Sequence, residues 1–82
     1  MDINEKVEDF YKMEVNDAKK TMKLIDNGSI SWGKKSEVAK NAIGRCYGVF
    51  FFAQSFEGYD YQRLAAAYEK TREELEDLGG LL

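Results

Sequence analysis

SEVAKNAIGRCYGVFFFAQSFE, residues 36–57, is apolar around most of its circumference when it is wound as an α-helix. At about 100° per residue, seven residues form one apolar face: Ala39, Ala42, Ile43, Cys46, Val49, Phe50 and Ala53. Gly44, Gly48 and Phe51 gather on the opposite side. A helix with two such sides needs a neighbour on each, and a chain of 82 residues has few helices to supply them. We therefore expect one of these neighbours to be another protein molecule.

Two flanking segments also have helical periodicity. Residues 2–26 carry an apolar stripe that consists of Ile3, Val7, Phe10, Ala18, Thr21 and Ile25. Asn27-Gly28 follows this stripe, and both residues tolerate the left-handed conformation that ends helices. Residues 60–78 have apolar positions at alternating spacings of three and four, which are Tyr61, Leu64, Tyr68, Thr71, Leu75 and Leu78.

Residues with capping side chains set the expected helix ends. Ser36 is expected to cap the middle helix, which continues to Gly58, and Asp60 is expected to cap the last one. The short connection between these two helices favours antiparallel neighbours. The sequence thus predicts a single all-α domain over residues 1–82, an antiparallel three-helix bundle with a long first helix that is expected to be oligomeric. Its helices are predicted at about 2–26, 36–57 and 60–78.

Composition narrows the classes of function. The chain has one cysteine and no histidine, so an intrachain disulfide and the usual zinc sites are excluded, and we expect neither a metal nor a cofactor. The net charge of −3 argues against a nucleic-acid partner. The acidic start lacks the features of a signal peptide, and the apolar run 46–53 is far shorter than the roughly 20 residues that span a bilayer. We expect a cytoplasmic protein with no membrane partner.

The loop before the middle helix contains a partial phosphate-binding pattern. Gly28 to Lys34 matches G-x-x-x-x-G-K, but Lys35 follows where a nucleotide triphosphatase needs Ser or Thr, and a helix precedes the loop in place of a strand. A simpler anion or nucleotide site at the helix N-terminus remains as a hypothesis, formed by Ser31, Trp32, Lys34, Lys35 and Ser36. The alternative is that Trp32 covers the end of the bundle while the lysines stay in solvent.

A carboxylate lies within the apolar stripe of the first helix. Glu14 needs a partner if it is buried, and Arg45, at the flank of the middle helix, is the natural one. We predict a structural ion pair, because no histidine or second convergent acid is available for acid–base catalysis. The protein is therefore expected not to be an enzyme.

The aromatic residues of the middle helix are the strongest remaining feature. Phe50, Phe51 and Phe52 point in three directions about 100° apart, so one small core cannot bury all of them. The glycines form a G-x-x-x-G pair that permits close backbone approach, although the first helix of the same chain could fill that space. The predicted interface consists of Gly44, Tyr47, Gly48, Phe51, Phe52 and Tyr59.

Residues 41–53, with Arg45, Tyr47 and Ala53, resemble a helix of HEPN-type domains, which act as nucleotidyltransferase partners or ribonucleases. The HEPN ribonucleases carry a histidine after the arginine. This chain has none, so the resemblance implies no activity here.

Together these features predict a non-enzymatic helical module that binds proteins. We expect it to self-associate through the middle helix and to bind a further, unidentified protein, as a small regulatory or accessory protein of bacterial or phage type. The alternative is a binder of a small anionic ligand or nucleotide at residues 31–36.

Overall fold

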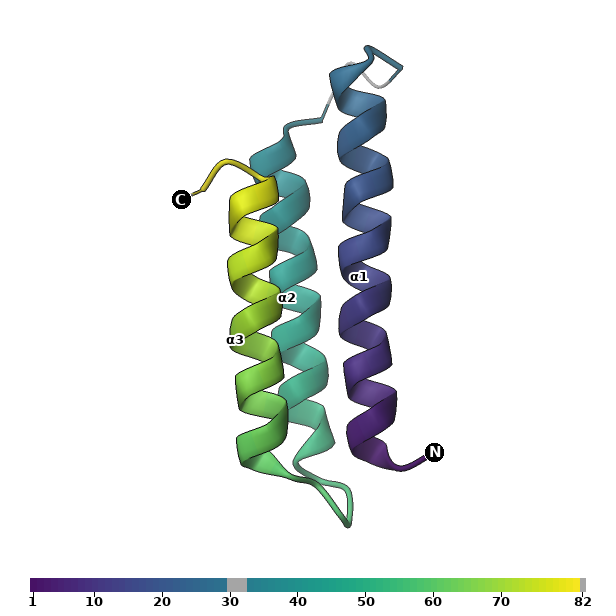
Figure 1. Ribbon diagram of the computed structural model, residues 1–82, viewed down its shortest axis with the longest axis vertical. Coiled ribbons are helices and arrows are strands. Elements are labelled where there is room, and N and C mark those ends of the chain that lie inside the picture. The colour runs from purple at the N-terminus through teal and green to yellow at the C-terminus, as the bar shows by residue number, and fades with distance from the viewer. Residues whose placement is uncertain (30–32, 82) are drawn as a thin grey trace.

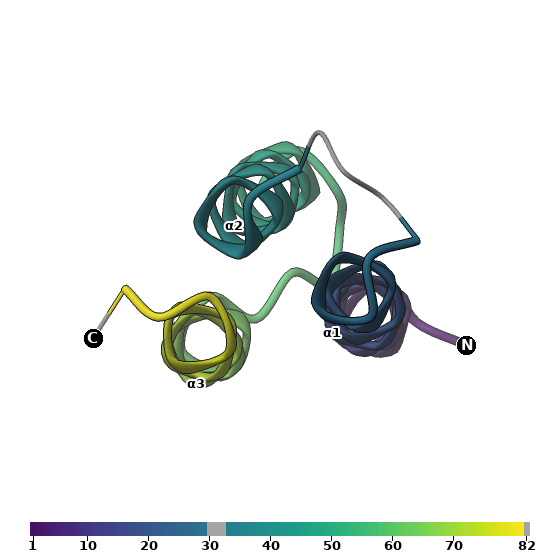
Figure 2. The same ribbon diagram turned by 90° about the horizontal axis from the view of Figure 1, so that it is seen from above.

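Three α-helices account for most of the chain. The computed structural model describes residues 1–29 and 33–81, with α1 (Ile3–Asp26), α2 (Lys35–Ala53) and α3 (Tyr61–Leu78). The helices lie side by side along the long axis of a rod of 44 × 24 × 14 Å (Figure 1). Seen from above, they occupy the corners of a triangle (Figure 2), and each helix contacts the other two. The predicted all-α, three-helix class is confirmed.

The ends of α1 and α3 follow local capping chemistry. The Asp2 carboxylate accepts a hydrogen bond from the Glu5 amide at 2.8 Å, and Asp60 accepts one from the Arg63 amide at 3.1 Å. Gly28 ends α1 with a φ of +79°, which favours glycine. The sequence predicts these boundaries to within one residue because they depend on neighbouring residues alone.

Both ends of α2 differ from the prediction. The Lys34 carbonyl accepts the first helical hydrogen bond, from the Val38 amide at 3.1 Å, so Ser36 lies inside the helix and its assignment as the cap was wrong. This earlier start brings the Lys35 ammonium to 3.1 Å from the Asp26 carboxylate. The helix stops at Ala53, four residues before its predicted end. The amides of the next three residues donate to carbonyls three residues earlier in the chain, and the Ser55 hydroxyl donates to the Phe52 carbonyl at 2.8 Å.

The buried face of α1 is rotated from the predicted stripe. It consists of Asn4, Val7, Tyr11, Glu14, Val15, Ala18 and Met22. Because α1 faces the gap between two helices, residues on the α3 side, such as Tyr11, are buried in place of Phe10, which is only partly covered. On α3, Tyr61 was expected in the seam but is 59% exposed, since it lies at the end of the bundle.

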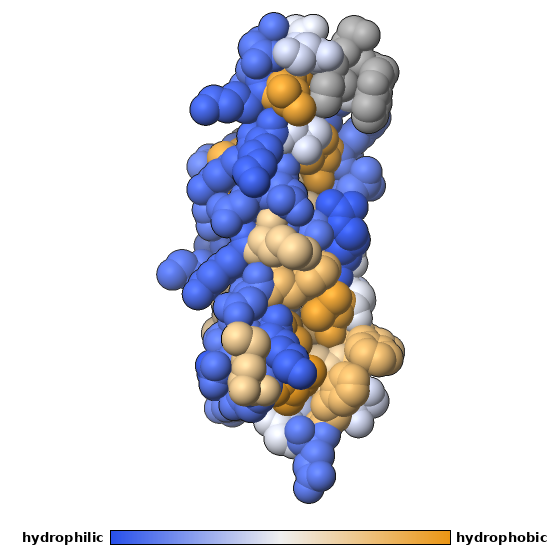
Figure 3. Space-filling view, turned by 90° about the vertical axis from the view of Figure 1, so that its right-hand side faces the viewer, coloured by the Kyte–Doolittle hydropathy of each residue, from blue (hydrophilic) through white to orange (hydrophobic). Residues whose placement is uncertain are grey.

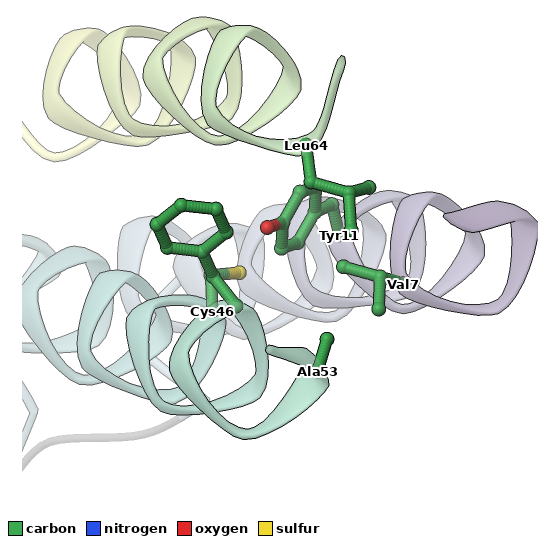
Figure 4. Close-up of a cluster of buried hydrophobic side chains, with 6 residues drawn as sticks. Val7, Tyr11, Cys46, Ala53 and Leu64 are labelled. Atoms are coloured by element: carbon green, nitrogen blue, oxygen red, sulfur yellow. The ribbon is translucent and has the colours of Figure 1, made fainter. Parts of the chain in front are cut away.

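The core is divided into two clusters along the rod. The lower cluster, shown in Figure 4, consists of Val7, Tyr11, Cys46, Phe50, Ala53 and Leu64. The upper cluster consists of Val15, Ala18, Met22, Ala39, Ala42 and Leu75. The predicted inner face of α2 is confirmed, and apart from Phe50 its fully buried members are small. Large side chains of α1 and α3 therefore supply most of the core volume.

Gly79, just beyond the end of α3, lies close to α2. A Cβ placed on it would lie 2.5 Å from the Cβ of Ala39 on α2 and 3.1 Å from the Lys35 carbonyl. At such separations neighbouring atoms must shift, so glycine is required here for packing and not for a left-handed backbone.

A buried asparagine fastens the connection between α2 and α3 to the start of α1. The Asn4 amide nitrogen donates to the Gly58 carbonyl at 3.0 Å, and its oxygen accepts from the Asp60 amide at 2.9 Å. Glu8 reinforces this end by a two-pronged contact with Arg63, at 3.0 and 2.6 Å.

Replacing Asn4 by alanine should lower the free energy of unfolding by about 1–3 kcal/mol, because it removes two partly buried hydrogen bonds. Denaturant unfolding followed by circular dichroism measures this change. Asn16→Ala, at an exposed position on the same helix, is the matched control and should shift stability little. Equal effects of the two substitutions would contradict the role assigned to Asn4.

Candidate interaction surface

The outer face of α2 carries large aromatic side chains in solvent. Phe51 and Phe52 are each 65% exposed and Tyr47 is 53% exposed, whereas Phe50 is buried in the core. Of the three consecutive phenylalanines, therefore, only one is accommodated by the bundle. We call the five residues on this side the aromatic face: Gly44, Tyr47, Gly48, Phe51 and Phe52.

The two glycines of the aromatic face border open space. A Cβ built on Gly44 or Gly48 would meet no other atom within 4 Å. The alternative that α1 packs against these glycines within one chain is therefore excluded. Glycine costs up to about 1 kcal/mol relative to alanine inside a helix, and no packing contact among the described residues offsets that cost at these two positions.

Neighbouring rings hold the exposed aromatic side chains in place. Tyr47 meets the ring of Tyr68 edge-on, with centroids 5.9 Å apart, and Phe52 meets Phe56 in the same way at 5.2 Å. Tyr68 in turn stacks on the buried ring of Phe50 at 5.8 Å. Tyr47 and Phe52 are thus restrained before any partner binds, which reduces the entropy lost on association.

Tyr59 does not belong to the aromatic face, although the sequence groups it with the interface. It is half-buried at the end of the bundle, where its ring packs on Phe50 at 6.2 Å and on Tyr61 at 6.3 Å. Burial raises the pKa of its hydroxyl. Tyr59 therefore packs against Phe50 inside the bundle and is not part of the exposed surface of α2.

Apolar surface also extends beyond α2. Met13 on α1 is 46% exposed and Phe56 is 41% exposed. Figure 3, which views the molecule from the α1 side, shows hydrophobic residues gathered over the lower half, bordered by hydrophilic ones. Sequence reasoning missed Met13 because a lone methionine at the flank of a charged helix has no distinctive pattern.

Glu14 and Arg45 meet at the edge of the aromatic face. The Arg45 Nε donates to the Glu14 carboxylate at 2.7 Å, with the glutamate buried and the arginine largely exposed. Burial, aided by Glu14, raises the pKa of the neighbouring Cys46 thiol to about 11. The thiol is thus protonated and unreactive at neutral pH.

Two of the residues proposed for anion binding, Ser31 and Trp32, lie outside the described residues. Lys34 is exposed at the N-cap position and makes no side-chain cap, while the Lys35 ammonium contacts Asp26. A shallow groove of about 360 Å³ nearby is lined partly by Lys19, Lys20 and Lys23. Two lysines that line this groove already pair with carboxylates, Lys35 with Asp26 and Lys19 with Glu74. The anion site therefore stays a prediction.

A second groove, of about 560 Å³, lies between α1 and α3 and away from the aromatic face. Ion pairs between these two helices, Lys19 with Glu74 and Glu8 with Arg63, lie along it. Within residues 1–29 and 33–81, no cluster of three His, Cys, Asp or Glu side chains could hold a metal ion. No helix in this part of the chain has the length and apolar character to cross a membrane.

No family model matches the chain, and neither a curated protein nor a solved structure matches it significantly. The resemblance of residues 41–53 to HEPN domains therefore has no support from a family match.

Gly44→Ala and Gly48→Ala should each raise the free energy of unfolding of the single chain by about 0.5–1 kcal/mol, because the new methyl group meets only open space. Gly79→Ala is the matched control and should lower it, since its methyl group would collide with Ala39. Denaturant titrations at low protein concentration measure all three. Loss of stability on replacing Gly44 or Gly48 would show that these glycines serve packing within the chain.

Proposed function

We propose that this chain is a non-enzymatic protein-binding module, an antiparallel three-helix bundle that self-associates through the outer face of α2. The single observation that carries the proposal is the exposure of Phe51, at 65%, beside two helical glycines that border open space. An exposed ring next to a small-residue gap is a knob with an adjacent hole, which is the arrangement that helix–helix contacts use.

The amount of exposed aromatic surface supports binding. Aromatic side chains have about 200 Å² of surface each, so the exposed fractions of Tyr47, Phe51, Phe52 and Phe56 correspond to roughly 450 Å². Patches of this size on monomeric proteins are often functional. Tyr and Phe are also enriched in interfaces, where rigid rings contribute much of the binding energy.

We propose that the module works in the cytoplasm as a small regulatory or accessory protein, with a second copy and an unidentified protein as its partners. The unreactive, buried thiol of Cys46 supports a reducing compartment, where a lone cysteine persists without forming a disulfide.

Phe51→Glu should convert the self-associated protein to a monomer, because a carboxylate would be buried without a partner in the interface. Light scattering on a sizing column, over a range of protein concentrations, measures the mass. Leu24→Glu is the matched control, since Leu24 is an exposed apolar residue of α1 and lies outside the aromatic face. Circular dichroism checks that both variants keep their helices. A wild-type mass that stays monomeric at every concentration would overturn self-association.

A further inference from the structure

We infer that two copies of this chain pair through α2 in antiparallel orientation, so that Phe51 of each copy fills the space over Gly44 of the other. This inference rests on the proposed function and specifies its geometry. The two-fold axis of this dimer is perpendicular to α2 and passes between the levels of Tyr47 and Gly48. A residue of one copy therefore lies at the same height along the helix as a residue of the other copy when their two numbers add up to 95.

The positions of the ring and the gap on α2 favour this arrangement. Phe51 follows Gly44 by seven residues, which places it two turns further along the same side of the helix, about 10 Å away. Nothing lies within 4 Å of a Cβ on Gly44 or Gly48, whereas Phe51 projects into solvent. An antiparallel pair with its axis halfway between them puts each ring over the partner's gap. In a parallel pair at matched levels, ring would meet ring and gap would meet gap.

Charge supports the same orientation. Lys34 precedes α2, exposed Glu37, Lys40 and Arg45 follow along it, and Glu57 lies beyond its C-terminal end. A parallel pair would set each lysine against its own copy. The antiparallel pair places Lys40 at the level of the partner's Ser55 and Glu37 at the level of its Gly58, on either side of Glu57, and it opposes the two helix dipoles.

The area is consistent with a dimer of two identical faces. Burial of roughly 450 Å² of aromatic surface on each copy gives about 900 Å². The aliphatic stems of Lys40 and Arg45 add to this area, and a total of about 1,000 Å² belongs to the small, weaker class of interfaces. A second copy supplies a surface of matching size because the same rings and gaps are present on it.

Disulfide trapping tests the orientation with Lys40→Cys and Ser55→Cys, two exposed positions whose numbers add up to 95. Each variant is oxidised alone and in an equimolar mixture, and mass spectrometry identifies the covalent dimers. The native Cys46 is fully buried, so it does not compete. We expect the mixed dimer to exceed either homodimer by about tenfold or more, because copies of residue 40 lie about 22 Å apart along the axis, beyond the reach of a disulfide.

The other outcomes are distinct. Efficient homodimer formation by Lys40→Cys alone would establish parallel pairing and overturn the inference. Absence of every cross-link in a protein that light scattering shows to be dimeric would place the interface elsewhere and overturn it as well. A monomeric wild-type protein would instead refute the self-association on which the inference rests. Adding Phe51→Glu to both cysteine variants is the control, and it should abolish the mixed dimer.

Discussion

The small size of the side chains on the inner face of α2 is the constraint on which the rest of the structure depends. Ala39, Ala42, Cys46 and Ala53 are all essentially inaccessible to solvent. Because these positions take little room, α1 and α3 approach α2 closely and fill the core with their own larger residues, such as Tyr11 and Leu64 on either side of it. The interior then has space for one phenylalanine of α2, and the other two are left on its outer side.

A core built from such small side chains gives the isolated chain limited stabilisation. A domain of 82 residues has a limited core, and among the described residues the buried hydroxyl of Tyr11 has no hydrogen-bond partner. An unpaired buried hydroxyl of this kind costs about 1–3 kcal/mol. Association through the aromatic face would offset such deficits, because it removes further apolar surface from water.

The parts of the fold that depend on adjacent residues could be predicted from the sequence, and those that depend on distant ones could not. Asp60 and the Asn27-Gly28 pair set helix ends through local hydrogen bonds, so they were identified. The rotation of α1, which buries Tyr11 in place of Phe10, depends on where α3 lies. Ser36 has the chemistry of a helix cap, but α2 begins one residue earlier, at Lys35, whose side chain contacts Asp26 at the end of α1.

The same division applies to the surface. Helical geometry alone requires that one of three successive phenylalanines leaves the core. It also puts Glu14 on the apolar side of its helix, so that a charged partner was expected, and Arg45 contacts it in the structure. Which rings are exposed, and whether Gly44 borders solvent or α1, depends on the final packing. Asn4 has no sequence signature, because its partners are 54 and 56 residues away. The two ends of the described chain lie at opposite ends of the rod (Figure 1). A group attached at the C-terminal end would therefore lie at the opposite end of the rod from Phe51 and Phe52, whereas a group fused at the N-terminal end would lie at the same end as these rings.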